Sequence, residues 1–549
     1  MKSQIESNIN QFVILSEIQS KKEGTVYLIK DQIDDSKYVQ KIFKSEQSKQ
    51  RVILNINRIS KISNHPGILP LICYNDTPFP TIITPYMPNG TLHESILQSQ
   101  IENSDHKVLT DTNKFLILIG IANAMRFLDI HHILFDDIDT SSIYLDENLL
   151  PKISFTKLLI QNEEKIDYIQ IYPKTIFSFS LIVYELLTGT KPIIEDFDSY
   201  EKSDARPDLS QINSEWICDF LRRCWSTMSL LRPRFVDILN ELNGHITDFG
   251  EIELETVKRY QTKIDEYFKN YIEKIEIYSK EDDMYSIFAY GKMLYHGYGV
   301  SVNKERAAQC FKKASELGYV FSMYNYAVLL ENGDGVCKDE EEAIILYKEV
   351  AKQGHPSSLC NYAHLLEEKN ENKEAVKMYK IAADRGCIHA LFNYANMLEN
   401  GNGIQMNVEE AAHYYKIAAE SGHLFSMYNY ASLLFRGKFV EMDKKKAALF
   451  FKIAADHGQV ESMFNYGIML YNGYGIDCDK KLAACYFKKA ADKGNSMAMH
   501  NYAILLNNGE GVKMNRREAS RYFKMAIDKG HAKSKKFYNN LKKYTKYRM

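Results

Sequence analysis

The chain has 549 residues, of which 45% are hydrophobic and 26% are charged, and its formal net charge is −2. This length exceeds what one ordinary hydrophobic core fills, so we expect at least two domains. The near-neutral balance gives no electrostatic reason to expect a nucleic-acid partner. The nine cysteines include no C-x-x-C pair, which indicates reduced thiols rather than a disulfide framework or a zinc site.

The amino-terminal segment does not resemble a secretory signal peptide. The amino-terminal stretch MKSQIESNINQFVILSEI lacks the apolar core of a secretory signal peptide. The longest apolar runs, such as FLILIGIA at residues 115–122, are far shorter than the roughly 18 residues that span a bilayer. We therefore predict a cytoplasmic protein without membrane or nucleic-acid partners.

Residues 10–245 contain a series of motifs in a characteristic order. They are IQSKKEGTVYLIK (18–30), YVQKIF (38–43), HPGILPLICY (65–74), PTIITPYMPNGTL (80–92), FSFSLIVYELLTGTKPI (177–193) and LRRCWSTMSLLRPRFVDIL (221–239). This order resembles that of a protein kinase of the tyrosine-kinase-like group. The resemblance implies a bilobal α+β domain, although fold alone does not establish activity.

The resemblance also assigns positions in a nucleotide site. Lys41 falls where the kinase family has its ATP-binding lysine, and Thr84 falls at the gatekeeper position. Gly24 and Val26 belong to the segment that corresponds to the glycine-rich loop. Asp137 falls at the position of the catalytic base. These residues are the predicted ATP-site and catalytic positions.

Both metal-ligand positions of the family carry other residues here. Phe155 stands where the aspartate of the D-F-G motif is expected, and Ser142 replaces the asparagine that ends the catalytic loop. Phenylalanine has no oxygen for Mg²⁺, which prefers oxygen ligands, and phosphoryl transfer depends on such ions. The replacements predict a pseudokinase that holds no metal and binds ATP weakly or not at all.

The rest of the predicted site is altered as well. Gln19 and Lys21 replace two glycines of the G-x-G-x-x-G frame, and Thr175 replaces the buried aspartate that anchors the catalytic loop in the family. Asn55 or Ile56 stands where the glutamate partner of the ATP-binding lysine is expected. Two alternatives stay open for what remains. Lys41 could still pair with a nucleotide phosphate, and the acidic run Asp136, Asp137 and Asp139 could hold a metal or simply be solvated.

Residues 246–283 are charged, free of proline and periodic in apolar residues, which predicts a connecting helix. A repeat occupies residues 284–531. Seven glycines recur at steps of 36, 32, 36, 36, 36 and 36 residues: Gly318, Gly354, Gly386, Gly422, Gly458, Gly494 and Gly530. Each unit has two segments of helical periodicity around a G-x-G turn, as in residues 462–494. Because the G-x-G pair recurs in five units and precedes no strand, it predicts a turn rather than a phosphate site.

These units resemble the Sel-one-like repeat, a relative of the tetratricopeptide repeat. The resemblance implies an all-α solenoid of helix-turn-helix repeats that binds other proteins. The expected molecule is thus multidomain, with a kinase-like domain followed by a solenoid. We expect a scaffold, adaptor or signalling regulator. The alternatives are a divergent active Ser/Thr kinase and a pure repeat adaptor with the kinase fold as a platform.

An asparagine recurs at one register in the first helix of six units. The six are Asn325, Asn361, Asn393, Asn429, Asn465 and Asn501, each followed by a tyrosine expected to face the core. Asparagine is a mediocre helix former, so helix propensity does not explain the repetition. The amides could bind the backbone of an extended peptide, or each could bond to the neighbouring unit and stabilise stacking.

Residues 532–549 contain basic residues and no acidic one. Such a segment could be a nucleic-acid or lipid patch. We instead predict a basic carboxyl-terminal cap, because a solenoid needs a terminal element with a polar outer face.

Overall fold

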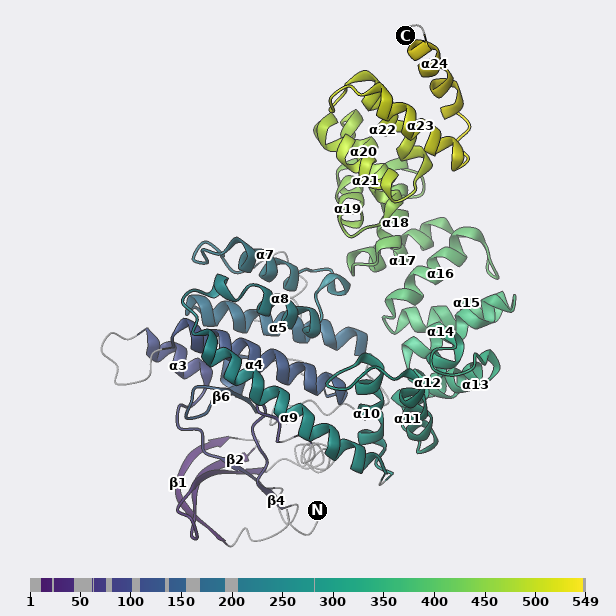
Figure 1. Ribbon diagram of the computed structural model, residues 1–549. Helices are drawn as coiled ribbons and strands as arrows, with labels where there is room; N and C mark the ends of the chain where they lie inside the picture. Colours follow the sequence, from purple (N-terminus) through teal and green to yellow (C-terminus); the bar gives the residue numbers. More distant parts are fainter. Residues whose placement is uncertain are drawn as a thin grey trace. The chain divides into compact units, whose positions relative to one another are not determined.

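A computed structural model describes the chain at residues 11–21, 24–43, 62, 64–75, 81–100, 109–133, 138–154, 168–192, 206–280 and 282–546. The chain forms two compact units, Met1–Ser358 and Leu359–Met549. The first contains the kinase-like region, the connecting helix and the first two repeats, and the second contains most of the remaining repeats (Figure 1).

The amino-terminal lobe is built on a five-stranded antiparallel sheet. In spatial order its strands are β1 (Phe12–Lys21), β2 (Gly24–Asp31), β3 (Lys37–Phe43), β5 (Thr81–Pro85) and β4 (Cys73–Asn75). Ile29, Cys73 and Ile83 form its buried apolar cluster. Alternate residues of a strand point to opposite faces, so the apolar cluster leaves the other face of β2, β3 and β5 for other contacts.

The carboxyl-terminal lobe is mainly helical. Its elements are α3 (Leu92–Ser99), α4 (Asp111–Ile130), η2 (Thr140–Ser142), the hairpin β6 (Ile143–Leu145) and β7 (Pro151–Ile153), α5 (Tyr168–Thr188), α7 (Glu215–Cys224), η4 (Ser229–Leu231) and α8 (Phe235–Gly244). Thr110 and Asn113 form a capping box at the start of α4, most of which is buried. α5 begins nine residues before the motif that starts at Phe177, and it includes Pro173. One proline removes only one helical hydrogen bond, and here the Pro173 carbonyl accepts from Arg232.

The connecting helix is shorter than predicted. A 3-10 turn, η5 (Ile246–Phe249), and Gly250 at φ 103° come before α9 (Leu254–Lys280). One stripe of α9 is buried at helical spacing, at Val257, Tyr260, Ile264, Phe268, Tyr271 and Ile275. Part of α9 packs against α4, where a Cβ on Gly120 would come within 2.6 Å of the Tyr260 hydroxyl. The helix is therefore part of the first unit's core and not a free linker.

The first repeat uses α9 in place of a preceding unit. In later repeats the second glycine of the turn lies against the start of the previous unit's second helix; a Cβ on Gly335 would come within 2.4 Å of the Lys304 carbonyl. The equivalent Gly299 instead faces Ile272 and Phe268 of α9. The connecting helix α9 thus supplies the terminal cap that a solenoid requires.

The end of α4 is held by the connecting helix and the first two repeats. The Tyr271 hydroxyl lies 2.8 Å from His131 Nε2, and the His132 ring lies 4.8 Å from the Phe288 ring and 4.6 Å from the Phe321 ring. His132 also has φ 53°, a conformation that costs energy for a residue other than glycine. The segment that enters the catalytic loop is therefore fixed by residues outside the kinase-like domain.

The repeats consist of helix pairs, as predicted. In the compact unit Met1–Ser358 the pairs are α10 (Met284–His296) with α11 (Lys304–Glu316) and α12 (Val320–Asn332) with α13 (Glu340–Lys352). α14 (Pro356–Glu368) contains the unit boundary, and the second unit continues with α15 (Asn372–Asp384), α16 (Ile388–Asn400), α17 (Val408–Glu420), α18 (Leu424–Arg436), α19 (Lys444–Asp456), α20 (Val460–Asn472), α21 (Lys480–Asp492), α22 (Ser496–Asn508), α23 (Arg516–Asp528) and α24 (Ser534–Lys546).

Two repeats depart from the common turn. Asn370 takes φ 62° in the shortened third repeat, and Phe439 takes φ 72° where the second turn glycine is missing. In the sixth repeat Gly467 faces the Phe487 ring, which a Cβ on Gly467 would approach to 2.7 Å. A flat ring at this position needs more room than an alanine methyl group.

Candidate functional site

The sheet brings the four predicted ATP-site positions to one face. Val26 pairs with Lys41 across β2 and β3, and Lys41 pairs with Ile82 across β3 and β5. Gly24 lies two residues before Val26, and Thr84 lies two residues after Ile82, so all four share that face. Thr84 is buried, and the Lys41 ammonium lies 5.0 Å from the centre of the Phe43 ring.

The requirement for glycine at position 24 has a structural explanation that does not involve phosphate binding. A Cβ at this position would come within 2.3 Å of the Ile42 carbonyl oxygen on β3. Because backbone cannot move aside as a flexible side chain does, the close approach of β2 and β3 by itself requires glycine here. Retention of Gly24 is therefore not evidence for nucleotide binding.

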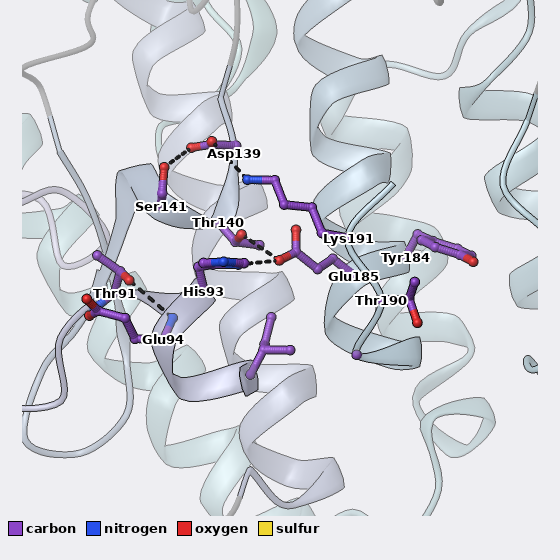
Figure 2. A network of polar contacts seen from close by, with 12 residues as sticks. Thr91, His93, Glu94, Asp139, Thr140, Ser141, Tyr184, Glu185, Thr190 and Lys191 are labelled. Atoms are coloured by element: carbon purple, nitrogen blue, oxygen red, sulfur yellow. Dashed lines mark hydrogen bonds and ion pairs between the residues drawn. The ribbon is translucent and has the colours of Figure 1, made fainter. Parts of the chain in front are cut away.

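The described part of the catalytic loop forms a closed set of polar contacts (Figure 2). The Ser142 hydroxyl donates to Asp139 Oδ1 at 2.7 Å, and the Ser141 hydroxyl donates to the same oxygen at 2.7 Å. Lys191 Nζ lies 3.5 Å from Asp139 Oδ2. Ser142 stands at the position that the kinase resemblance assigns to a metal ligand, and its hydroxyl proton is used in the hydrogen bond to Asp139.

A buried carboxylate ties the same loop to α5. Glu185 Oε1 accepts from the Thr140 hydroxyl at 2.9 Å and lies 2.7 Å from His93 Nδ1 on α3. The Glu185 side chain is only 5% exposed. The sequence reasoning missed this group, although an ionisable residue inside an otherwise apolar helical segment, FSFSLIVYELL, was a usable signal.

Other predicted positions lie outside the described residues. These are Asp137, Asp136 and Phe155, together with Asn55 and Ile56. Thr175, the replacement for the anchoring aspartate, lies buried in α5. Among the residues that the structure describes, no group of three His, Cys, Asp or Glu side chains could hold a metal ion.

The asparagine ladder of the repeats is not uniform. Burial of the tyrosine that follows is confirmed at Tyr326, Tyr394, Tyr430, Tyr466 and Tyr502. The six asparagines themselves are half-buried and differ in their partners. Asn325 Nδ2 donates to the Phe321 carbonyl of its own helix at 2.6 Å, and Asn361 also has an interaction partner.

Two members of the ladder bond to the preceding repeat. Asn393 bonds to the Tyr379 hydroxyl and Asn429 bonds to the Tyr415 hydroxyl. The Tyr415 hydroxyl also donates to Glu399 Oε2 at 2.8 Å, and burial followed by this carboxylate raises the pKa of Tyr415. At Asn393 and Asn429 the asparagine bonds to the neighbouring repeat, which is the stacking alternative and not the peptide-binding one.

The last two members have no such bond. The residues equivalent to Tyr379 and Tyr415 are Phe451 and Phe487 before Asn465 and Asn501. Within residues 359–546 no hydrogen-bond partner is found for the Asn465 or Asn501 amide. These two partly exposed amides are therefore available to an external partner.

The sequence reasoning also missed the acidic partners of the tyrosines. Tyr347, Tyr379 and Tyr415 each donate to a glutamate on the first helix of the same repeat, at 2.7, 3.1 and 2.8 Å. The glutamates are Glu331, Glu367 and Glu399. The signal was present, because glutamate and tyrosine occur together at these two registers in the second to fourth repeats and in no other repeat.

Two family models match this chain. The model described as protein tyrosine and serine/threonine kinase matches residues 17–242. The Sel1 repeat model matches seven times, at residues 285–319, 320–355, 359–387, 388–423, 424–459, 460–495 and 496–531. Both resemblances predicted from the sequence are confirmed.

Curated relatives match in the kinase-like region at low identity. Serine/threonine-protein kinase STY17 of Arabidopsis thaliana is 23% identical over 211 residues, covering 34% of this chain and 35% of the relative. Interleukin-1 receptor-associated kinase 3 of Mus musculus is 25% identical over 279 residues, covering 40% of this chain and 45% of the relative. The chain thus spans less than half the length of these relatives.

Two solved structures match about half of this chain. A protective antigen of uropathogenic Escherichia coli with an SLR fold has 23% identity and a TM-score of 0.46, covering 49% of this chain and 59% of that one. A Sel1 repeat protein from Oxalobacter formigenes has 22% identity and a TM-score of 0.41, covering 50% of this chain and 81% of that one. Separately, none of the helices in the described ranges is both long and apolar enough to cross a membrane.

Proposed function

We propose, from the premise that this chain joins a protein-kinase-like domain to seven Sel1 repeats, that it is a signalling adaptor. In this proposal the kinase-like domain transfers no phosphate and acts as a binding and support module. The repeats hold a protein partner. The cytoplasm is the proposed location.

The observation that carries the proposal is the state of Ser142. A kinase uses at this position the side-chain carbonyl oxygen of an asparagine to bind a metal ion. The chain has instead the hydroxyl of Ser142, which donates to Asp139, and the other Asp139 oxygen lies near Lys191. Replacement of the second metal ligand by Phe155 in the sequence supports the same conclusion. A site that cannot gather Mg²⁺ loses most of the electrostatic stabilisation on which phosphoryl transfer depends.

For the partner, the support comes from the unpaired end of the asparagine ladder. An amide offers two donors and an acceptor, which suits the backbone of an extended peptide. Asn465 and Asn501 have these groups free, whereas Asn393 and Asn429 use theirs between repeats. We therefore assign partner contact to Asn465 and Asn501 and a stacking role to Asn393 and Asn429.

The test of the inactive domain is a radiolabel-transfer assay with the full chain, ATP and Mg²⁺. We expect no transfer to the protein itself or to a generic substrate. Transfer that is lost in Asp137→Ala would establish the rival function, a divergent active kinase. The matched control is Asp139→Asn, which removes a nearby carboxylate and leaves the base position intact.

Nucleotide binding is tested by calorimetry and thermal shift, with and without Mg²⁺. We expect a dissociation constant weaker than about 1 μM, which corresponds to roughly −8 kcal/mol, and little effect of Mg²⁺. A tight, Mg²⁺-dependent affinity contradicts the proposal. Complete absence of binding reduces the domain to a structural platform for the repeats.

A further inference from the structure

The carboxyl-terminal end of the repeat region is strongly basic. Residues 513–546 contain twelve lysines and arginines and two acidic residues, although the whole chain has a net charge of −2. The exposed ones lie on α23, on α24 and beside them (Figure 1): Lys513, Arg516, Arg517, Arg521, Lys524, Lys529, Lys533, Lys535, Lys536 and Lys542. We call this surface the basic end.

Much of the charge of the basic end is not neutralised by neighbouring carboxylates. In the preceding repeats lysines pair with acids, as Lys446 does with Glu420 at 3.3 Å and Lys480 with Glu510 at 2.8 Å. Within residues 359–546 no ion pair involves Lys535, Lys536 or the arginines of α23. Unpaired charges of one sign at this density produce a positive potential that extends into solvent.

The docking of α24 turns its lysines outward. Ser534 and Leu541 are buried, and the Phe537 ring stacks on the Phe523 ring of α23 at 5.5 Å. Lys535 and Lys542 are seven residues apart and so lie on one face of α24, away from the buried positions.

Apolar side chains protrude among these charges. Phe537 is 41% exposed next to Lys536, and Met514 is 55% exposed next to Lys513. Nine of the twelve basic residues are lysines, which act as point charges, whereas bidentate recognition of a phosphate favours arginine. Exposed lysines with intervening apolar side chains suit a broad anionic surface into which an apolar group can insert.

We propose that the basic end docks on the surface of an anionic lipid bilayer. The lysines contact the headgroups, and Met514 reaches the boundary of the acyl chains. This contact is peripheral and needs no spanning helix. It departs from the expectation of no membrane partner, which was based on the absence of a spanning apolar run, because a local excess of positive charge can bind a membrane surface without one. The inference does not depend on the function proposed for the kinase-like domain.

The experiment is co-sedimentation of the full chain with vesicles of phosphatidylcholine alone or with about 30% phosphatidylserine. We expect binding to the anionic vesicles only, and a steep loss when salt is raised from about 50 mM to about 500 mM. The test variant combines Lys535→Glu, Lys536→Glu and Lys542→Glu, and we expect it to bind at least about tenfold more weakly.

The control variant combines Lys445→Glu, Lys481→Glu and Lys488→Glu, which changes the net charge equally at exposed positions outside the basic end. It should keep full binding, and circular dichroism melting shows whether both variants remain folded. Equal binding of both variants, or no preference for phosphatidylserine, overturns the proposal. Wild-type binding to single-stranded RNA or polyglutamate that matches or exceeds binding to the vesicles also overturns it, in favour of a polyanion partner.

Discussion

The kinase-like domain and the repeats both keep the residues that shape their folds, but they differ in what surrounds those residues. In the kinase-like domain, Arg232 is buried and donates to the carbonyls of Pro173 and Ser226, so a family residue is retained for packing. At the position that the kinase resemblance assigns to a metal ligand, the chain has Ser142. In the repeats, Gly335 and Gly475 recur because the preceding unit's backbone leaves no room for a Cβ. A retained family residue or a recurring glycine thus indicates that the fold is kept. Whether a site is active must be judged from the side-chain atoms present at that site.

The largest effect on stability should come from placing a side chain at a recurrent turn glycine of the repeats. Gly475 has φ 75°, and a Cβ would lie 2.5 Å from the Lys444 carbonyl carbon. Gly475→Phe therefore adds both backbone strain and a clash with backbone, and we expect a loss of at least about 4 kcal/mol in unfolding free energy. Urea unfolding measures it. An unchanged midpoint would show that recurrence in the repeats does not report shape.

A smaller effect should follow from removing the ion pair between the kinase-like domain and the first repeat. Lys292 Nζ donates to the Asp129 carbonyl at 3.0 Å and lies 3.6 Å from its carboxylate, with side chains only 12% and 16% exposed. Lys292→Ala leaves a buried carboxylate without its closest cation, and we expect a loss of about 3 kcal/mol.

The measurement is thermal unfolding of the full chain, with the double variant Lys292→Met and Asp129→Asn as the control. The double variant should recover part of the loss because it removes the unpaired charge and keeps the aliphatic packing. If the single variant is as stable as the wild type, the two folds are not coupled at this contact.

The histidine caps of the repeats predict a dependence on pH. His423 Nδ1 accepts from the Ser426 N–H at 3.2 Å, and burial lowers the pKa of His423 to about 4. The unfolded chain, with an ordinary value near 6.5, binds a proton before the folded chain does, so stability falls as the pH drops below about 6.5 and levels off below about 4. We expect a loss of about 2 kcal/mol between about pH 7.5 and pH 5 from this group.

His423→Asn keeps a capping acceptor that does not titrate, and its urea midpoint should change less over the same pH interval. The equivalent His355 in the first unit has the same cap and a pKa of about 4. His355→Asn is therefore a second variant on which the result can be repeated. An identical pH profile for wild type and His423→Asn would exclude this cap as the source.

The two halves of the asparagine ladder should behave oppositely. Asn393→Ala with Asn429→Ala removes amides bonded to Tyr379 and Tyr415, and we expect each to cost about 1 kcal/mol. Asn465→Ala with Asn501→Ala removes unpaired amides, so the melting temperature should stay the same while partner capture is lost. The reverse pattern would refute the division of the ladder.

The smallest effect should be a gain. Phe439 takes φ 72° at a turn position that is glycine in most other repeats, and its side chain is 45% exposed. Phe439→Gly relieves this strain against a modest entropic cost, and we expect a stabilisation of about 0.5 kcal/mol. A loss above about 1 kcal/mol would instead show that the ring packs usefully, for example with Lys438. Urea unfolding beside Gly475→Phe makes the two substitutions a matched pair.

Much of this fold could be predicted because its signals are local. Helix periodicity, turn glycines and the order of kinase motifs predicted the two folds and the helix pairs. The pairing of Val26 with Lys41 puts the predicted ATP-site positions on one face of the sheet, an arrangement that follows from regular strand alternation. The start of α5 was missed because Pro173 is a strong local signal for a break, whereas packing of the helix overrides one lost hydrogen bond.

What the sequence alone determined was the identity of the replaced residues, such as Ser142 and Phe155, and the register of the repeats. Only the tertiary structure showed that Gly24 is required by the close approach of β3, and that α9 packs where a preceding repeat would lie. It also showed that Asn429 has a hydrogen-bond partner in the preceding repeat, whereas Asn465 has none. The physical reason is range. Periodicity reports contacts within a few residues along the chain, whereas hydrogen-bond partners and close backbone approaches come from distant segments that only the folded chain brings together.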